Sequence, residues 1–434
     1  MPSVRLAKPL EVPVMRFNIK EHKRAVIIFA AALALVIGFS LFFILRYTER
    51  VDYIDDDGIL SGDFSRYVTV DKSVYDGAVV NIKISPVGEV DIEERVMLDL
   101  VGLRTSDNPK FTRAGEIGVG DKLIITSYKV ESEGGEILAE QSGVGIEHFV
   151  GETFKIYGYE LSGMQVALVG LTVGEQIIYA RLPYSYHDAA LACERVKITL
   201  NIDKFIDYTV PDVDDELISE KLKLDEELAA LAGDTLTEKY YTYIKNELER
   251  EYAEAVKALG EEAVWRMLTE NASIKRLPRA DVRDKYHAYY AEIEEIYTAY
   301  AASVMSFEDF GAAYVGLSDG ESLDDYLMRE AELSVADKLT FYYVISTEGW
   351  IPDSSALAEL YSAVVEEYLA VYVANDLTCR PEYFKNSADY DKKVAEHRQK
   401  LLEDFGEDYF YDVVYSEYGM AKLVEAVKIV NVLE

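Results

Sequence analysis

The sequence predicts an α+β protein with an N-terminal transmembrane helix, a small antiparallel β domain and an all-α domain of long helices. Three observations support this prediction: an uncharged apolar run over 25–45, short alternating runs between 115 and 207, and three-and-four spacing of apolar residues after Pro211. At 434 residues the chain is also longer than a typical single domain. The predicted parts are a basic cytoplasmic tail (1–24), a transmembrane anchor (25–45), an acidic linker and mixed α/β connecting segment (46–112), the β domain (113–208) and the helical domain (209–434).

The apolar run 25–45 is long enough to cross a bilayer, because a helix of this length reaches roughly 30 Å. Basic residues dominate the segment before it, and acidic residues follow it, so the positive-inside rule keeps the N-terminus in the cytoplasm. A cleaved signal peptide is one alternative, but "RYTER" offers no small-residue cleavage site. A buried soluble helix is the other, and the basic flank disfavours it. We expect a single-pass cell-membrane protein whose C-terminal bulk is extracytoplasmic.

Composition excludes several classes of function. The formal net charge of −35 argues against a nucleic-acid partner, because phosphate binding requires a basic face. The five histidines are scattered and form no Cys/His cluster, so we expect neither a metal nor a cofactor. The two cysteines, Cys193 and Cys379, either pair across domains or remain buried thiols, and the second alternative is favoured.

Before Pro211 the patterns indicate short mixed elements. The acidic, glycine-punctuated segment 51–67 is typical of a linker, and its consecutive aspartates are interpreted as solvated. We expect a strand over 78–84 and a helix over 91–103. The β domain should contain strands over 121–130, 176–182 and 195–202, the last with strict apolar alternation.

After Pro211 the patterns indicate helices. Thr235 and Glu238 have capping-box spacing and open a long amphipathic run to about residue 259. The same spacing continues through 286–300 and 420–430, and Pro352 and Asp353 mark another helix start.

Residues 159–207 place several glycines between short strands and end this run on Pro-x-x-Tyr. The positions concerned are Glu160, Leu161, Gly163, Met164, Gly170, Gly174, Glu175, Pro183 and Tyr186, followed by "LACERVKITLNI" and preceded by "GDKLIITSYKVESEGGE". This pattern resembles the second half of an FKBP-type peptidyl-prolyl isomerase domain, which combines a hydrophobic pair, a glycine, a short helix, a glycine-glutamate turn, a strand and Pro-x-x-Tyr. In that resemblance the first of the two quoted segments is the closing strand and the second is the opening hairpin.

The resemblance implies an apolar pocket that holds a proline ring. It assigns the catalytic contacts to Leu161, Met164, Tyr186 and Ile198 and the substrate-binding rim to Tyr128, Leu138 and Glu160. This chain departs from the family in four places: Met164 replaces a large aromatic floor, Ile198 a phenylalanine, Glu160 a hydrophobic residue and Ala139 an acid. The resemblance therefore implies a weak or degenerate isomerase.

The segment 310–360 contains a series of spaced positions: Leu317, Ser318, Leu323, Arg329, Ala331, Ile351 and Pro352. In this order the segment is similar to the C-terminal chaperone domain of the trigger factor family. The family's ribosome-docking signature, Gly-Phe-Arg-x-Gly-x-x-Pro, is absent from the sequence, so no ribosome docking is expected.

The combined pattern leads to one hypothesis and one alternative. The hypothesis is a membrane-anchored extracytoplasmic foldase or chaperone that binds unfolded or nascent secreted polypeptides, with isomerase activity in the β domain. The alternative is a noncatalytic cell-envelope scaffold whose helices bind one folded partner. The 33 tyrosines suit either, because their rings give amphipathic contact surface.

Overall fold

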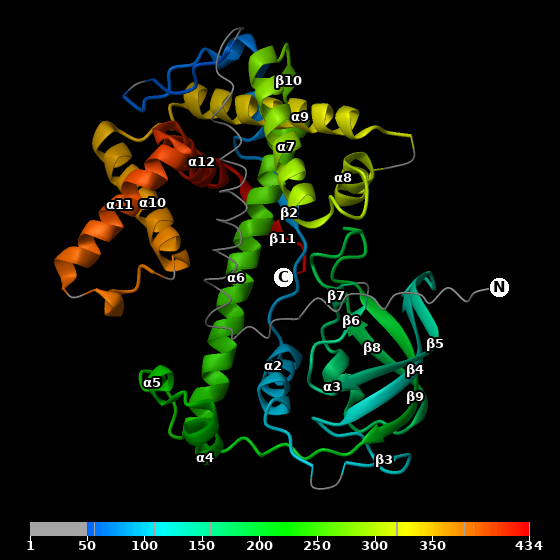
Figure 1. Ribbon diagram of the computed structural model, residues 1–434. Coiled ribbons are helices and arrows are strands. Elements are labelled where there is room, and N and C mark those ends of the chain that lie inside the picture. The colour runs from blue at the N-terminus through cyan, green and yellow to red at the C-terminus, as the bar shows by residue number, and fades with distance from the viewer. Residues whose placement is uncertain are drawn as a thin grey trace. The chain divides into compact units, whose positions relative to one another are not determined.

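The computed structural model describes residues 50–433 except 56, 107–108, 157, 318–319, 377 and 385 (Figure 1). The described chain forms two compact units, each assembled from two stretches of sequence. Unit 1 contains residues 50–78 and 265–426, and unit 2 contains residues 79–264 and 427–433.

Unit 2 is built on a five-stranded antiparallel sheet. β9 lies between β4 and β8, β5 pairs with the other edge of β4, and the short β3 pairs with the end of β9. The strands predicted over 121–130, 176–182 and 195–202 are confirmed. The bounds are β3 (Phe111–Thr112), β4 (Lys122–Ser132), β5 (Ile137–Phe149), β8 (Gly174–Arg181) and β9 (Arg195–Ile206), with a separate pair β6 (Lys155–Ile156) and β7 (Tyr159–Glu160).

The short helix α3 (Met164–Leu168) completes the core of this sheet. Met164 and Leu168 are fully buried and join the buried side chains of β4 and β9 in one hydrophobic cluster. Burial of each such side chain contributes about 1.5–3 kcal/mol relative to exposure. Gly163 caps α3 with a φ of 84°, a left-handed conformation that glycine adopts without a Cβ penalty.

Helix α2 (Glu89–Val101) confirms the helix expected near 91–103 and packs within unit 2 against the start of α6. The predicted capping box at Thr235 is confirmed: the Glu238 N–H donates to Thr235 Oγ1 over 3.1 Å. α6 is one continuous helix whose residues from 265 onward belong to unit 1. The bounds are α4 (Asp215–Leu217), the π-helix η3 (Ile218–Leu222), α5 (Asp225–Leu228) and α6 (Leu236–Glu270).

The last described strand, β11 (Lys428–Asn431), pairs in parallel with β2 (Val79–Ile82) inside unit 2. The Asn431 side chain continues the pairing, because its Nδ2 donates to the Ile84 carbonyl over 2.8 Å and its Oδ1 accepts from the Ile84 N–H. The prediction of a helix through residue 430 is therefore wrong beyond Ala426, where α12 ends. An all-α C-terminal part is wrong as well, because β10 and β11 lie within it.

Unit 1 is a helical assembly around a core of leucine, valine, phenylalanine and tyrosine side chains. α9 and α12 approach so closely that a Cβ added at Gly419 would lie 2.7 Å from the side chains of Phe341 and Ile345. The predicted start near Pro352 is confirmed, since Asp353 caps α10. The helices are α7 (Arg279–Tyr300), α8 (Phe307–Val315), α9 (Leu323–Glu348), α10 (Ser354–Asn375), α11 (Ser387–Phe405), α12 (Glu407–Ala426) and the 3-10 turns η1 (Phe64–Arg66), η2 (Lys72–Val74) and η4 (Pro381–Tyr383); β1 (Val68–Thr69) pairs with β10 (Ser273–Ile274).

The segment interpreted as a linker contributes to this core. Val51, Phe64 and Tyr67 are buried with α9, α10 and α12 side chains. The two cysteines are both free and buried, which confirms the favoured alternative for them.

The predicted fold class requires a correction. The described residues form a mixed α/β fold in which no helix combines the length and the apolar character needed to cross a membrane. The transmembrane helix and the single-pass membrane localisation that depended on it are therefore not supported, and the run 25–45 lies outside the described residues.

Candidate functional site

The predicted proline-pocket residues come together in unit 2. Leu161 follows β7, Met164 opens α3, and Ile198 lies on β9; all three are buried in one hydrophobic cluster, with Met164 and Ile198 fully covered. Tyr128 on β4 belongs to the same cluster. Leu138 and Tyr186 are partly buried and pack against it.

Glu160 differs from the other predicted residues because it is exposed. Its carboxylate lies 3.1 Å from the ammonium of Lys155 on the neighbouring strand β6. Glu160 and Leu161 line a cavity of about 480 Å³ in unit 2. Phe154, which the sequence analysis did not single out, lines the same cavity and meets the ring of Tyr128 edge-on at 6.2 Å.

An aromatic group stands at the Pro-x-x-Tyr end of this site. The ring of Tyr186 lies 4.9 Å from that of Tyr159 and 4.3 Å from that of His187. Burial raises the pKa of Tyr186, so its hydroxyl remains a neutral hydrogen-bond donor.

Helix α2 fixes the turn that carries Leu161 and Met164. Glu94 Oε2 accepts the Gly163 N–H over 2.8 Å, and its Oε1 accepts the Gln165 N–H over 2.7 Å. Asp91 accepts the Ser162 hydroxyl over 2.9 Å. The Glu94 carboxylate thus satisfies two backbone N–H groups at the start of α3, and Asp91 holds the preceding Ser162 side chain. Burial nevertheless raises the pKa of Glu94.

A buried polar group supports the other side of the same turn. Gln165 Oε1 accepts the Gly151 N–H and lies 3.0 Å from His148 Nε2. Burial lowers the pKa of His148, which keeps the imidazole neutral. The sequence analysis missed Glu94, Gln165 and His148, because nothing in their spacing shows that α2, α3 and β5 meet.

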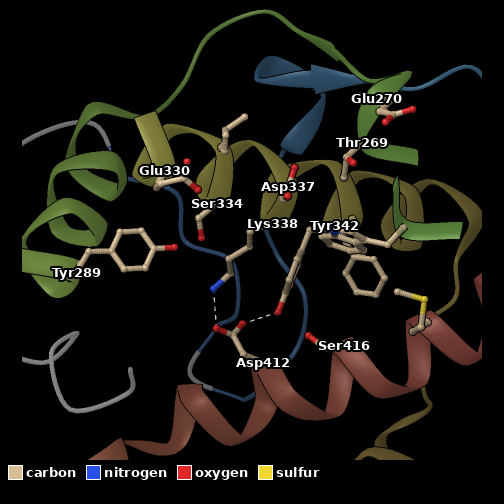
Figure 2. A pocket seen from close by; sticks show the side chains of 14 residues that line it. Thr269, Glu270, Tyr289, Glu330, Ser334, Asp337, Lys338, Tyr342, Asp412 and Ser416 are labelled. Atoms are coloured by element: carbon tan, nitrogen blue, oxygen red, sulfur yellow. Dashed lines mark hydrogen bonds and ion pairs between the residues drawn. The ribbon is translucent and has the colours of Figure 1, made fainter. Parts of the chain in front are cut away.

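Unit 1 contains a second and larger pocket, of about 820 Å³ (Figure 2). Its apolar walls include Trp265 at the end of α6, Phe341 and Leu333 on α9, and Met420 on α12. Trp265 and Phe341 are packed with ring centroids 5.4 Å apart, whereas the Leu333 side chain is 52% exposed. The full lining is Trp265, Thr269, Glu270, Tyr289, Glu330, Leu333, Ser334, Asp337, Lys338, Phe341, Tyr342, Asp412, Ser416 and Met420.

Charge in this pocket is predominantly negative. Figure 2 shows Lys338 and Tyr342 extending from α9 to the same carboxylate, Asp412 on α12. Lys338 Nζ lies 2.6 Å from Asp412 Oδ2, and the Tyr342 hydroxyl donates to Oδ1. Burial and the neighbouring Asp412 raise the pKa of Tyr342. Glu270, Glu330 and Asp337 add three more carboxylates to the lining, and burial raises the pKa of Asp337.

Within the part of the chain that the structure describes, no group of three or more His, Cys, Asp or Glu side chains is arranged to hold a metal ion.

Comparisons with known proteins point in one direction. No family model matches the chain. Individual trigger factors are similar to it in sequence. The trigger factor of Streptococcus gordonii strain Challis is 26% identical over 236 residues, which is 53% of this chain and 50% of the relative. That of Streptococcus suis strain 98HAH33 is 30% identical over 149 residues, 33% of each chain, and that of Enterococcus faecalis strain V583 is 28% identical over 174 residues, 38% of this chain and 39% of the relative.

The chain thus spans about half the length, or less, of these curated relatives, and over that part it is trigger factor-like. A solved structure concerning promiscuous substrate recognition in folding and assembly activities of the trigger factor chaperone aligns with 82% of this chain and 73% of its own. The identity there is 15% and the TM-score 0.30, which is too low to support a conclusion.

Proposed function

We propose that the chain is a chaperone that binds unfolded polypeptide segments in the pocket of unit 1. The observation that carries this proposal is the pocket of about 820 Å³, whose walls combine aromatic rings, an exposed leucine and a rim of carboxylates. The similarity to trigger factors over part of the chain supports the same class of function.

The chemistry of the pocket suits a flexible chain more than a rigid small molecule. Trp265 and Tyr289, both partly exposed, offer ring surface to side chains that a folded protein would bury. The carboxylates around them keep the chaperone soluble and self-repelling while its apolar surface is open.

The test uses two exposed apolar residues of the same helix. Leu333→Asp places a charge in the pocket wall, whereas Met328→Asp changes an exposed residue of α9 that does not line the pocket. We expect the wild-type chain and Met328→Asp to suppress the aggregation of reduced lysozyme, followed by light scattering, and Leu333→Asp to lose most of that effect. Equal suppression by both variants, or none by the wild type, would contradict the proposal.

We further propose that the β module of unit 2 accelerates prolyl isomerisation. The supporting observation is that Leu161 lines a cavity of unit 2 and belongs to the same apolar cluster as Met164, Ile198 and Tyr128, which do not line the cavity themselves. Such a site accelerates the reaction because the twisted imide has lost resonance and needs less hydration than either planar isomer, so an apolar site binds it preferentially.

A proline-limited refolding assay tests the isomerase proposal. Uncatalysed isomerisation takes tens of seconds, so catalysis is visible as a faster slow phase. We expect the wild type to accelerate this phase, Tyr186→Ala to lose the acceleration, and Tyr179→Ala, an exposed tyrosine of β8, to retain it. An unchanged slow phase with the wild type would remove the isomerase proposal and leave the chaperone proposal intact.

A scaffold that binds one folded partner is the competing function. Capture from a mixture of denatured and native proteins separates the two. The chaperone should retain many denatured proteins and release them on refolding, whereas a scaffold should retain a single native protein at a fixed stoichiometry.

A further inference from the structure

The start of the described chain, residues 50–54, lies against the helices that form the pocket of unit 1. We call these residues the strap. Val51 is 7% exposed and belongs to the unit 1 core. Arg50 pairs with Asp284 on α7, so the strap is held by charge at one end and by apolar burial next to it.

Tyr53 contacts two side chains of the pocket wall and one further residue of α7. Its hydroxyl donates to Asp281 Oδ2 on α7 over 3.1 Å. Its ring meets the Tyr342 ring edge-on, with centroids 5.4 Å apart. The ammonium of Lys338 lies 4.3 Å from the centre of the same ring. Tyr53 therefore contacts both α7 and α9.

The two α9 residues that Tyr53 contacts are those that hold Asp412. Lys338 and Tyr342 line the pocket and both bond that carboxylate, whereas Tyr53 itself is not among the lining residues. Tyr53 lies behind the wall and acts on the pocket through its neighbours. In Figure 2 the blue ribbon of the N-terminal segment passes behind Lys338 and Tyr342.

Removal of the Tyr53 ring would release this arrangement. Lys338 would lose a cation–π contact, a type of interaction that contributes about 0.5–2 kcal/mol, and Tyr342 would lose an aromatic neighbour. Both side chains could then leave the geometry that joins α9 to α12, and the wall of the pocket would lose its fixed shape.

We propose that the strap positions the wall of the client pocket and that Tyr53 is its positioning residue. This inference rests on the proposed chaperone function, and it adds that client affinity is set by a segment more than two hundred residues upstream of the pocket helices. Any change that displaces residues 50–54 from α7 and α9 would therefore alter the affinity of the pocket for unfolded chains.

The test uses the full chain with Trp350→Phe, so that Trp265, which lines the pocket, is the single remaining tryptophan. Tyr53→Phe keeps the ring and removes the hydrogen bond to Asp281, whereas Tyr53→Ala removes both. Leu401→Ala, on α11 and fully buried in the same core outside the pocket lining, controls for loss of stability. Binding of reduced, carboxymethylated α-lactalbumin is measured by titration. The solvent exposure of the pocket wall is followed by the emission wavelength of Trp265.

We expect Tyr53→Ala to weaken client binding about tenfold and to shift Trp265 emission to longer wavelength. The client affinity of Tyr53→Phe should stay within about twofold of the wild type. Leu401→Ala should lower the melting temperature but leave both client affinity and Trp265 emission unchanged. The strap proposal is overturned if Tyr53→Ala binds like the wild type, or if Leu401→Ala weakens binding equally. If the wild type binds no client, the proposed function fails, and an unshifted Trp265 emission in Tyr53→Ala then overturns the strap separately.

Discussion

At the residue scale, charged groups that line the pocket of unit 1 pair with residues that are distant in sequence. Lys338 and Asp412 are 74 positions apart, and nothing in either local pattern indicates that they meet. The tyrosines, in contrast, could be anticipated as ring surface from their number and helical spacing. The sequence thus predicted what kind of surface the helices carry, but not where α9 and α12 place its charges.

Asp337 gives a pH-dependent test at this scale. Because burial raises its pKa above the value of an unfolded chain, ionisation destabilises the folded state, and the loss develops as pH rises from about 4 through the raised pKa. Asp337→Asn removes the charge and keeps the shape. We expect the variant to gain stability relative to the wild type over that window and then to reach a plateau. Urea unfolding at a series of pH values measures this; a difference that is constant with pH would contradict the assignment.

Lys223 gives a test of backbone strain. It ends the π-helix η3 with φ 54° and ψ 48°, a left-handed conformation that costs a non-glycine residue about 1 kcal/mol. Lys223→Gly should therefore raise the free energy of unfolding by about 0.5–1 kcal/mol. The matched control is Lys245→Gly in the exposed interior of α6, which should lower it by about 1 kcal/mol. Destabilisation by Lys223→Gly would show that its side chain matters more than its backbone.

At the element scale, long periodic segments were predictable and short pairings were not. The alternation of β9 and the amphipathic spacing of α6 reflect burial on one face, which a single segment records in its own sequence. The two-residue strand β10, the parallel strand β11 and the strap form only because distant partners are present. The proposed proline-pocket residues come from the family resemblance, whereas neither segment's own pattern indicates that α2 packs against α3.

The docking of α2 can be tested through Glu94. Glu94→Ala leaves the Gly163 and Gln165 N–H groups without their acceptor, a loss of about 2–3 kcal/mol for bonds to a charged group. We expect faster hydrogen exchange of these two amides and a lower free energy of unfolding of unit 2. Glu93→Ala, at the exposed neighbouring position, should change neither. Unchanged protection of both amides in Glu94→Ala would mean that α2 does not fix this turn.

At the scale of the whole molecule, both units are discontinuous in sequence. Unit 1 takes its strap from the start of the described chain, and unit 2 takes β11 from its end. The predicted succession of a β domain and a helical domain did not include this exchange, because sequence patterns describe neighbours along the chain.

Deletion of residues 428–434 tests whether unit 2 needs its distant strand. The deletion removes the parallel partner of β2 and the three hydrogen bonds made by the Asn431 side chain to Ile84 and Tyr252. We expect increased hydrogen exchange in β2 and lower thermal stability of unit 2, with little change in the pocket of unit 1. Asn431→Ala should give a smaller effect in the same direction. Unaltered exchange in β2 would show that the pairing contributes no stability.

The pairing of β2 with β11 cannot form until the C-terminal strand has been translated. Ile84 and Asn431 are 347 positions apart, and at about 5–20 residues per second the later partner is translated on the order of half a minute after the earlier one. Throughout that interval β2 lacks its partner strand, and its unpaired backbone N–H and C=O groups can pair with other chains. A protein proposed to protect other chains from such associations would thus pass through the same hazard during its own synthesis.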